Sequence, residues 1–172
     1  MMKFTGVVRR LDLLGRVVIP KEYRKMLKIK PGDPLEIIAM ENGDILIRKV
    51  DISVELAVAG LPVVEEVNSI LDLGVMLSDG EKYLAGAGSV KDRLVGTALS
   101  PKAKSLVENR KSYAGRAAEI GLKEAEYVLL HPISGETVFG AIVLFSDRPI
   151  EKSGSQVLQL AAKVLSNSMQ RF

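Results

Sequence analysis

Cysteine and tryptophan are both absent from this chain of 172 residues, and only 5% of its residues are aromatic. Without cysteine the chain can form no disulfide, no thiolate metal site and no cysteine nucleophile. With so few aromatic rings, its cores must rely on Val, Leu and Ile. No stretch approaches the ~20 apolar residues of a membrane span, and the N-terminus lacks the apolar core of a signal peptide. We therefore expect a cytoplasmic protein with no membrane partner.

The positive charge of the chain is concentrated in its first third. The formal net charge is only +3, yet residues 1–50 contain 11 Lys and Arg against 6 Asp and Glu, a net charge of +5. Residues 51–172 contain 13 against 15, a net charge of −2. This asymmetry indicates that an acidic partner, above all nucleic acid, would bind the N-terminal part.

A short helix is predicted directly after Pro20, whose missing N–H group would be unpaired in a first helical turn anyway. Four basic residues would share one face of it, at i, i+3, i+4 and i+7: Lys21, Arg24, Lys25 and Lys28. Three larger apolar residues repeat the same spacing on another face: Tyr23, Met26 and Leu27. One side of the helix can pack while the other carries charge. Concentrated positive charge of this kind is suited to a phosphate backbone.

The same third of the chain predicts four short strands. One pair, residues 4–10 and 16–19, flanks a turn at 12–15. The other pair, 35–38 and 45–48, flanks Asn42-Gly43, for which we expect a type I′ turn. A unit of about 50 residues with so few aromatic side chains buries too little apolar surface to be comfortably stable alone. We therefore expect it to form a homodimer by exchanging strands, which would present two copies of the basic surface to a duplex.

Residues 1–50 resemble the AbrB family, the swapped-hairpin DNA-binding domains of bacterial transition-state regulators. Three segments carry the resemblance in order and spacing: Thr5-Gly6-Val7-Val8-Arg9-Arg10, Asp12-x-Leu14-Gly15-Arg16-Val17-Val18-Ile19-Pro20-Lys21-Glu22 and Pro31-Gly32-Asp33-Pro34-Leu35-Glu36-Ile37. The resemblance implies a mostly β dimer with interleaved strands. It places the family's DNA contacts on Arg9, Arg16, Arg24 and Lys25. Relatives often carry arginine at this last position, and lysine keeps the charge but loses the planar fork that binds bidentately.

We accordingly expect six basic residues to bind double-stranded DNA: Arg9, Arg10, Arg16, Lys21, Arg24 and Lys25. Arg9, Arg16 and Arg24 would read base edges, and the lysines would hold phosphates as point charges. The competing interpretation is a solvated basic surface without a partner. It fits the helix taken alone, but the strand pattern, the charge asymmetry and the family spacing together argue against it.

From residue 51 onward the pattern predicts a separate α+β domain, with a linker at 51–55 and the domain itself over 56–172. A helical spacing over 52–72 is interrupted by Gly60 and Pro62, which predicts two helical pieces or a kink. Two hairpins follow, at 73–86 and 127–145, with two short helices between them and a terminal helix over 153–172. This order favours an antiparallel sheet layered with helices.

The order of elements resembles a small GAF domain, a sensory module found beside many bacterial regulators. An AbrB-type domain followed by a GAF-like domain resembles the arrangement of sporulation transcription regulators, so we predict a sequence-specific DNA-binding regulator of this type. The helices over 52–72 and 154–171 could be core helices or a seam that joins two dimers into a tetramer. The GAF-like domain would serve oligomerisation and could hold an unidentified small-molecule effector between its sheet and helices.

No catalytic residue, metal site or cofactor is predicted. His131 is the single histidine, so metal or triad chemistry has no second histidine, and we interpret it as structural. Gly86-Ala87-Gly88-Ser89 precedes a helix that could hold an anion, but it lacks the third glycine of a dinucleotide fingerprint. An enzyme is therefore not expected. The alternative from another class is an antitoxin-like interaction module on the same dimer, against which the folded, near-neutral residues 51–172 argue.

Overall fold

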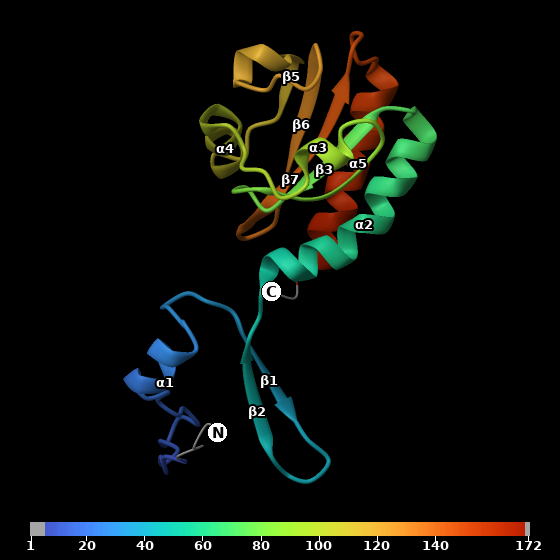
Figure 1. Cartoon of the computed structure of the whole chain (residues 1–172). Coiled ribbons are helices and arrows are strands. Elements are labelled where there is room, and N and C mark those ends of the chain that lie inside the picture. Colours follow the sequence, from blue (N-terminus) through green and yellow to red (C-terminus); the bar gives the residue numbers. More distant parts are fainter. Residues whose placement is uncertain (1–5, 171–172) are drawn as a thin grey trace. The chain divides into compact units, whose positions relative to one another are not determined.

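The computed structural model describes residues 6–170, and the chain divides into two compact units, residues 1–50 and 51–172, each with its own sheet (Figure 1). The segment 51–55, expected as a linker, instead contains the start of α2 (Ile52–Leu71). Asp51 is the N-cap of this helix, and its side chain accepts a hydrogen bond from the Ser53 N–H group at 3.0 Å. Within residues 6–170, no helix combines the length and apolarity that crossing a membrane requires.

The first unit contains α1 (Lys21–Met26) and a hairpin of β1 (Leu35–Ala39) and β2 (Ile45–Lys49), as predicted. The turn of this hairpin is not the predicted type I′ turn. Ala39 pairs with Ile45, and the Gly43 N–H group donates to the Met40 carbonyl at 3.0 Å. Gly43 has a φ of +87°, whereas Asn42 does not have a positive φ. The loop is therefore a turn closed by a left-handed glycine bulge, which needs only one positive φ.

The strands predicted at 4–10 and 16–19 are not formed within the single chain. Phe4 and Thr5 lie outside the described residues, and residues 6–11 and 16–20 have no strand pairing. Their backbones meet only at the predicted turn, where the Asp12 N–H group donates to the Arg16 carbonyl at 3.0 Å. An isolated hairpin is marginal in water, and this one has no third strand beside it in the same chain.

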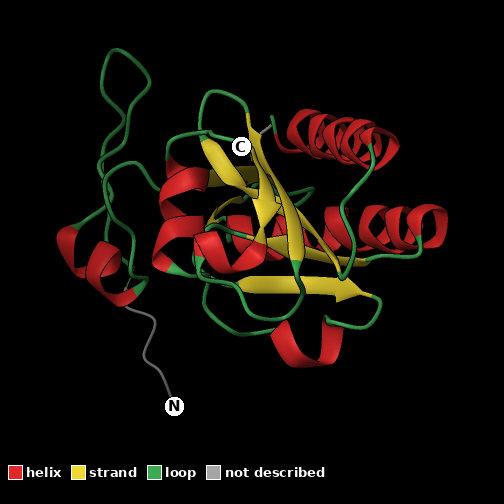
Figure 2. Ribbon diagram, turned by 90° about the horizontal axis from the view of Figure 1, so that it is seen from above, coloured by secondary structure: helices red, strands yellow, loops and turns green. Residues whose placement is uncertain are grey.

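The second unit is a five-stranded antiparallel sheet in the order β4-β3-β7-β6-β5, which confirms the predicted α+β architecture. The strands are β3 (Gly74–Ser78), β4 (Tyr83–Ala87), β5 (Tyr113–Arg116), β6 (Tyr127–Ser134) and β7 (Val138–Ser146). The remaining helices are α3 (Lys91–Leu94), α4 (Pro101–Glu108), the 3-10 helix η1 (Ala117–Ile120) and α5 (Lys152–Met169). Helices lie on both faces of the sheet (Figure 2). The short β5 and η1 were not predicted.

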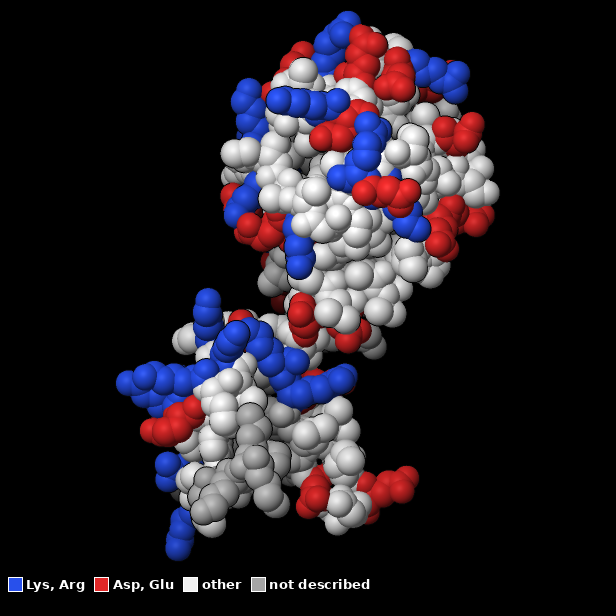
Figure 3. Space-filling model, in the orientation of Figure 1, with Lys and Arg blue, Asp and Glu red and all other residues white. Residues whose placement is uncertain are grey.

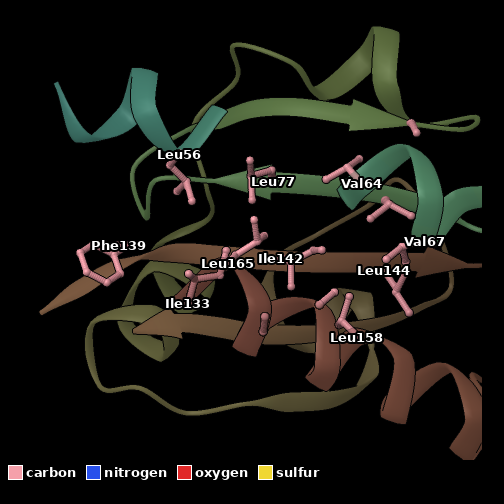
Figure 4. Packing of buried hydrophobic residues seen from close by; sticks show 14 of the residues in the cluster. Leu56, Val64, Val67, Leu77, Ile133, Phe139, Ile142, Leu144, Leu158 and Leu165 are labelled. Carbon is pink, nitrogen blue, oxygen red and sulfur yellow. The ribbon is translucent and has the colours of Figure 1, made fainter. Parts of the chain in front are cut away.

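Successive strand side chains face opposite layers, so the sheet separates two hydrophobic cores. Leu77 and Ile142 pack with the residues of α2 and α5 on one face (Figure 4). Met76 and Val143, their neighbours in the chain, pack with α3, α4 and η1 on the other. Both faces are covered, which explains why β3 and β7 read as nearly continuous apolar runs rather than as alternating ones.

α2 is one continuous helix, so of the two alternatives predicted from Gly60 and Pro62 the division into two pieces is wrong, whereas the bend of the helix in Figure 1 agrees with a kink. Gly60 lies so close to the Leu77 side chain of β3 that a β-carbon there would collide with it. The buried face of the helix, which includes Leu56 and Val64, packs on the sheet. This tertiary packing outweighs the low helix propensity of glycine and proline. The helix ends at Asp72, which adopts a left-handed φ of 52°.

Candidate nucleic-acid interface

α1 brings together three of the predicted DNA contacts on one short helix. Lys21, Arg24 and Lys25 are all exposed, and within the described part of the chain none of them has an ion-pair partner. In Figure 3, Lys and Arg side chains predominate over the part of the first unit that contains α1, with few acidic side chains among them, and further acidic side chains lie at the far end of its hairpin. α1 carries three cations against one acidic residue, Glu22 in its first turn, and this excess leaves a local positive potential that attracts phosphate.

Lys28 does not extend the basic face of α1 as the sequence predicted. It has a φ of 53°, and its N–H group donates to the Lys25 carbonyl at 3.2 Å. The Ile29 N–H group donates to the Arg24 carbonyl at 2.8 Å. These are the two hydrogen bonds of a Schellman motif with Lys28 in the left-handed position. The motif ends the helix after Met26, so three helical cations share the face instead of four.

Arg16 lies at the turn before α1 and is oriented by Asp12. The Asp12 carboxylate accepts hydrogen bonds from the N–H groups of Leu14 at 2.9 Å and of Arg16 at 2.8 Å, and from Arg16 Nε at 2.7 Å. The backbone and side-chain hydrogen bonds of Arg16 hold the pKa of Asp12 below its usual value. The Arg16 side chain is still 72% exposed. A solvent-exposed ion pair of this kind is weak, so a phosphate or a base edge can replace Asp12 as the partner of Arg16.

Arg9 lies in a groove of about 360 Å³ beside α1. The rest of this groove is mainly apolar, with walls from Val7, Val17, Ile19, Tyr23, Leu27, Ile29 and Ile47 among others. Arg10 is exposed next to it. Within residues 6–170 no ion pair or side-chain hydrogen bond joins Arg9, Arg10 or Arg16 to α1. The structure therefore groups the three cations of α1 and leaves the three arginines on the preceding segment.

The groove is the functional feature that sequence reasoning missed. The sequence assigned packing to Tyr23, Met26 and Leu27, but Met26 and Leu27 remain 63% and 52% exposed. The groove extends this apolar surface to Ile29, which follows the C-terminal end of the helix, and to Ile47 of β2. One signal in the sequence could have revealed the groove. The segments before and after α1 each contain apolar residues, and a unit of about 50 residues is too short to provide all of them with apolar partners.

Other basic residues of the first unit are used by its own fold. Lys49 Nζ lies 2.7 Å from Asp33 Oδ2 and donates to the Lys28 carbonyl at 3.1 Å. The Lys49 hydrogen bond, together with the Lys30 N–H group, holds the pKa of Asp33 below its usual value. Arg48 pairs with Glu36 across the hairpin. The cations of α1 differ from these because they have no such structural role.

Comparisons with known proteins find a separate family match for each of the two units. Residues 8–53 match the family model described as antidote-toxin recognition MazE, bacterial antitoxin. Residues 56–170 match the model described as stage V sporulation protein T C-terminal, transcription factor. Stage V sporulation protein T of Bacillus subtilis (strain 168) is 31% identical over 178 residues, which covers 99% of this chain and 100% of the relative.

Two further similarities each cover part of the chain. The transition state regulatory protein AbrB of the same bacterium is 35% identical over 88 residues, 51% of this chain and 82% of AbrB. The GAF-B domain of DevS from Mycobacterium smegmatis has a TM-score of 0.57 at 17% identity and covers 67% of this chain and 93% of its own, which shows a GAF-like fold. With an AbrB-like first unit and a GAF-like second unit, the chain belongs to the stage V sporulation protein T family of transcription factors.

Proposed function

We propose that this chain is a sequence-specific DNA-binding regulator of sporulation or transition-state genes, acting in the cytoplasm and without enzymatic activity. The observation that carries the proposal is the group of exposed cations on α1, three against the single Glu22 of the same helix, none of which forms an ion pair within residues 6–170. Membership of a transcription-factor family supports it. The residues proposed to contact double-stranded DNA are Arg9, Arg10, Arg16, Lys21, Arg24 and Lys25.

The first unit binds DNA as a homodimer. Its groove and the uncovered side chains of Met26 and Leu27 leave apolar surface in contact with water in the single chain. Residues 6–11 and 16–20 have no strand partner in that chain either. The N-terminal hairpin of a second copy would cover the groove and pair these backbones at the same time, as expected for exchanged strands.

The second unit joins two dimers into a tetramer. α2 and α5 pack side by side on one face of the sheet (Figure 1), and each also carries apolar residues that point away from the core. Val58 of α2 is 70% exposed and Leu160 of α5 is 64% exposed, with Val54 and Val164 one helical turn away on the same helices. Such a paired stripe favours a helical seam between copies. The same unit also senses a small-molecule effector.

Fluorescence anisotropy with duplexes selected from a random pool tests DNA binding. The two α1 lysines in each half of a dimer would neutralise four phosphates, which contributes about −3.6 to the log–log salt slope. The double variant Lys21→Ala, Lys25→Ala removes these four contacts and should reduce the magnitude of the slope by about 3.6. The control is Lys91→Ala, Lys123→Ala, which removes the same charge from exposed positions of the second unit. No binding to any duplex at low salt, or equal slopes for both variants, would reject the proposal.

The antitoxin-like function remains the second candidate because residues 8–53 match an antitoxin family model. In that case the dimer would present the second unit to a protein partner. Purification of the tagged chain from its host would then recover a small protein in stoichiometric amounts. Recovery of DNA fragments without such a partner favours the regulator.

A further inference from the structure

A cavity of about 450 Å³ opens at one end of the five-stranded sheet of the second unit. Its inner walls include Gly74 of β3, Val90 before α3, and Phe145 and Ser146 at the end of β7, all of which are buried. The volume lies in the range of small-molecule sites. The sequence places an effector between the sheet and its helices, but buried side chains fill the layers on both faces of the sheet.

Five charged residues of both signs surround the cavity: Asp72, Arg93, Glu124, Asp147 and Arg148. Among residues 6–170, none of these five takes part in an ion pair, although Arg116 pairs with Glu126 elsewhere in the same unit. Glu124 accepts only a backbone hydrogen bond, from the Lys123 N–H group at 2.8 Å. The charges around the cavity are therefore available to a ligand.

The side chain of Tyr83 lies behind the cavity wall. Tyr83 is 1% exposed, and its Oη is the one buried side-chain oxygen or nitrogen of the described residues without a hydrogen-bond partner. Its ring meets Phe145 edge-on, with 6.3 Å between centroids. Burial, and then the nearby Glu124 carboxylate, raise the pKa of Tyr83. Tyr83 itself does not line the cavity, so its ring supports the wall residue Phe145 from behind and its hydroxyl is not a ligand contact.

We propose that this cavity binds a small zwitterion of the free amino acid type. Its carboxylate would be held by the guanidinium groups of Arg93 and Arg148, since arginine matches a carboxylate bidentately. Its ammonium group would face the carboxylates of Asp72, Glu124 and Asp147. A small apolar side chain would lie on Val90 and Phe145. A plain anion would leave three carboxylates beside it uncompensated, and an apolar ligand would leave all five charges unused.

α2 is the covalent connection between this site and the first unit, which is proposed to bind DNA. Asp72, the left-handed C-cap of α2, and Leu73 lie on the cavity, and the Asn68 side chain donates to the Leu73 carbonyl at 2.8 Å. At its other end the same unbroken helix begins at Ile52, three residues after β2 ends at Lys49. A ligand that favours one arrangement of α2 would change DNA affinity by about 5- to 150-fold. This regulatory part rests on the proposed function, whereas ligand binding does not.

Thermal unfolding and calorimetric titration of the full chain with each of the twenty standard amino acids test the site. At one hundred times its Kd, a bound amino acid should raise the Tm by about 5 to 10 °C. Arg93→Ala and Arg148→Ala should each weaken binding at least tenfold, and Ser89→Trp should block the cavity. Lys111→Ala, at an exposed position that does not line the cavity, is the control and should bind as the unchanged chain does.

Three outcomes would overturn the zwitterion site: no amino acid binds, acetate or inorganic phosphate binds as tightly as any amino acid, or the arginine variants and Ser89→Trp bind as Lys111→Ala does. DNA affinity measured with and without the amino acid separates this inference from the proposed function. If the chain binds no DNA with or without the amino acid, the proposed function is rejected. The zwitterion site is then tested by the calorimetric titration alone. DNA affinity that is unchanged by a bound amino acid overturns the regulatory part.

Discussion

Arg16 and Asp12 form a closed unit at the turn before α1, in which the Asp12 carboxylate binds both the backbone N–H group and the Nε of Arg16. The turn therefore sets the direction of a cation that is otherwise largely exposed. Ordering a long side chain before a partner arrives reduces the entropy lost on binding. The same carboxylate is easily displaced, because it is itself exposed to solvent.

Arg16→Ala should weaken specific DNA binding by about 1–3 kcal/mol, the value of a bidentate base contact. Fluorescence anisotropy with the preferred duplex measures this change. Arg48→Ala is a matched control, since Arg48 is also an exposed arginine of the first unit with a single acidic partner, Glu36. If both variants lose the same amount of DNA affinity, the loss follows from removing any arginine of this unit. Arg16 would then make no specific contact with a base.

Gly140→Ala should destabilise the second unit by about 3 kcal/mol. Gly140 has a φ of 155°, and a β-carbon on it would collide with the backbone carbonyl of Ser78 across the β3–β7 pair. Gly96→Ala is the control, because Gly96 also has a positive φ, +84°, but a β-carbon on it would meet no other atom within 4 Å. It should cost only about 1 kcal/mol. Calorimetric unfolding of the full chain measures both, and equal losses would contradict the collision.

The elements with strong local signals were predictable from sequence. The start of α4 is an example of such a signal: serine is a favoured N-cap and proline fits the first helical position, and the Ser100 side chain before Pro101 accepts a hydrogen bond from the Ala103 N–H group. Gly60 and Pro62 left open either two helical pieces or a kink, and the burial of Leu56 and Val64 against the sheet keeps α2 in one piece. β5 was missed because four residues that include a glycine give no strand pattern, and it exists only through pairing with β6.

The candidate site was partly predictable for a similar reason. The three cations of α1 follow from helical periodicity, which is a local property. The exclusion of Lys28 depends on its left-handed φ, and no glycine or asparagine marks that position. The groove beside α1 depends on residues as distant as Val7 and Ile47 meeting in space. Periodicity within one element carries no information about such contacts.

The stability of the second unit should decrease as the pH falls below about 6.5, in part because of His131. Burial lowers the pKa of His131, whose Nδ1 lies 2.7 Å from Ser112 Oγ. Between this lowered value and 6.5 the unfolded chain binds more protons than the folded one, so stability rises with pH and is lost on acidification. His131→Gln removes the titration and should narrow the difference in Tm between about pH 7.5 and 5.5. An unchanged difference would show that carboxylates alone set the pH dependence.

Tyr83→Phe should leave the Tm unchanged or raise it. The substitution keeps the ring that packs edge-on against Phe145 and removes a hydroxyl that has no hydrogen-bond partner among residues 6–170. Tyr113→Phe removes a hydroxyl whose single proton is shared between the Arg116 carbonyl at 3.0 Å and Glu119 Oε2 at 2.7 Å. It should cost about 1 kcal/mol, the usual net value of a hydrogen bond. Differential scanning calorimetry compares the two variants. A Tyr83→Phe variant that unfolds at a lower temperature than Tyr113→Phe would show that the Tyr83 hydroxyl has a stabilising partner in solution.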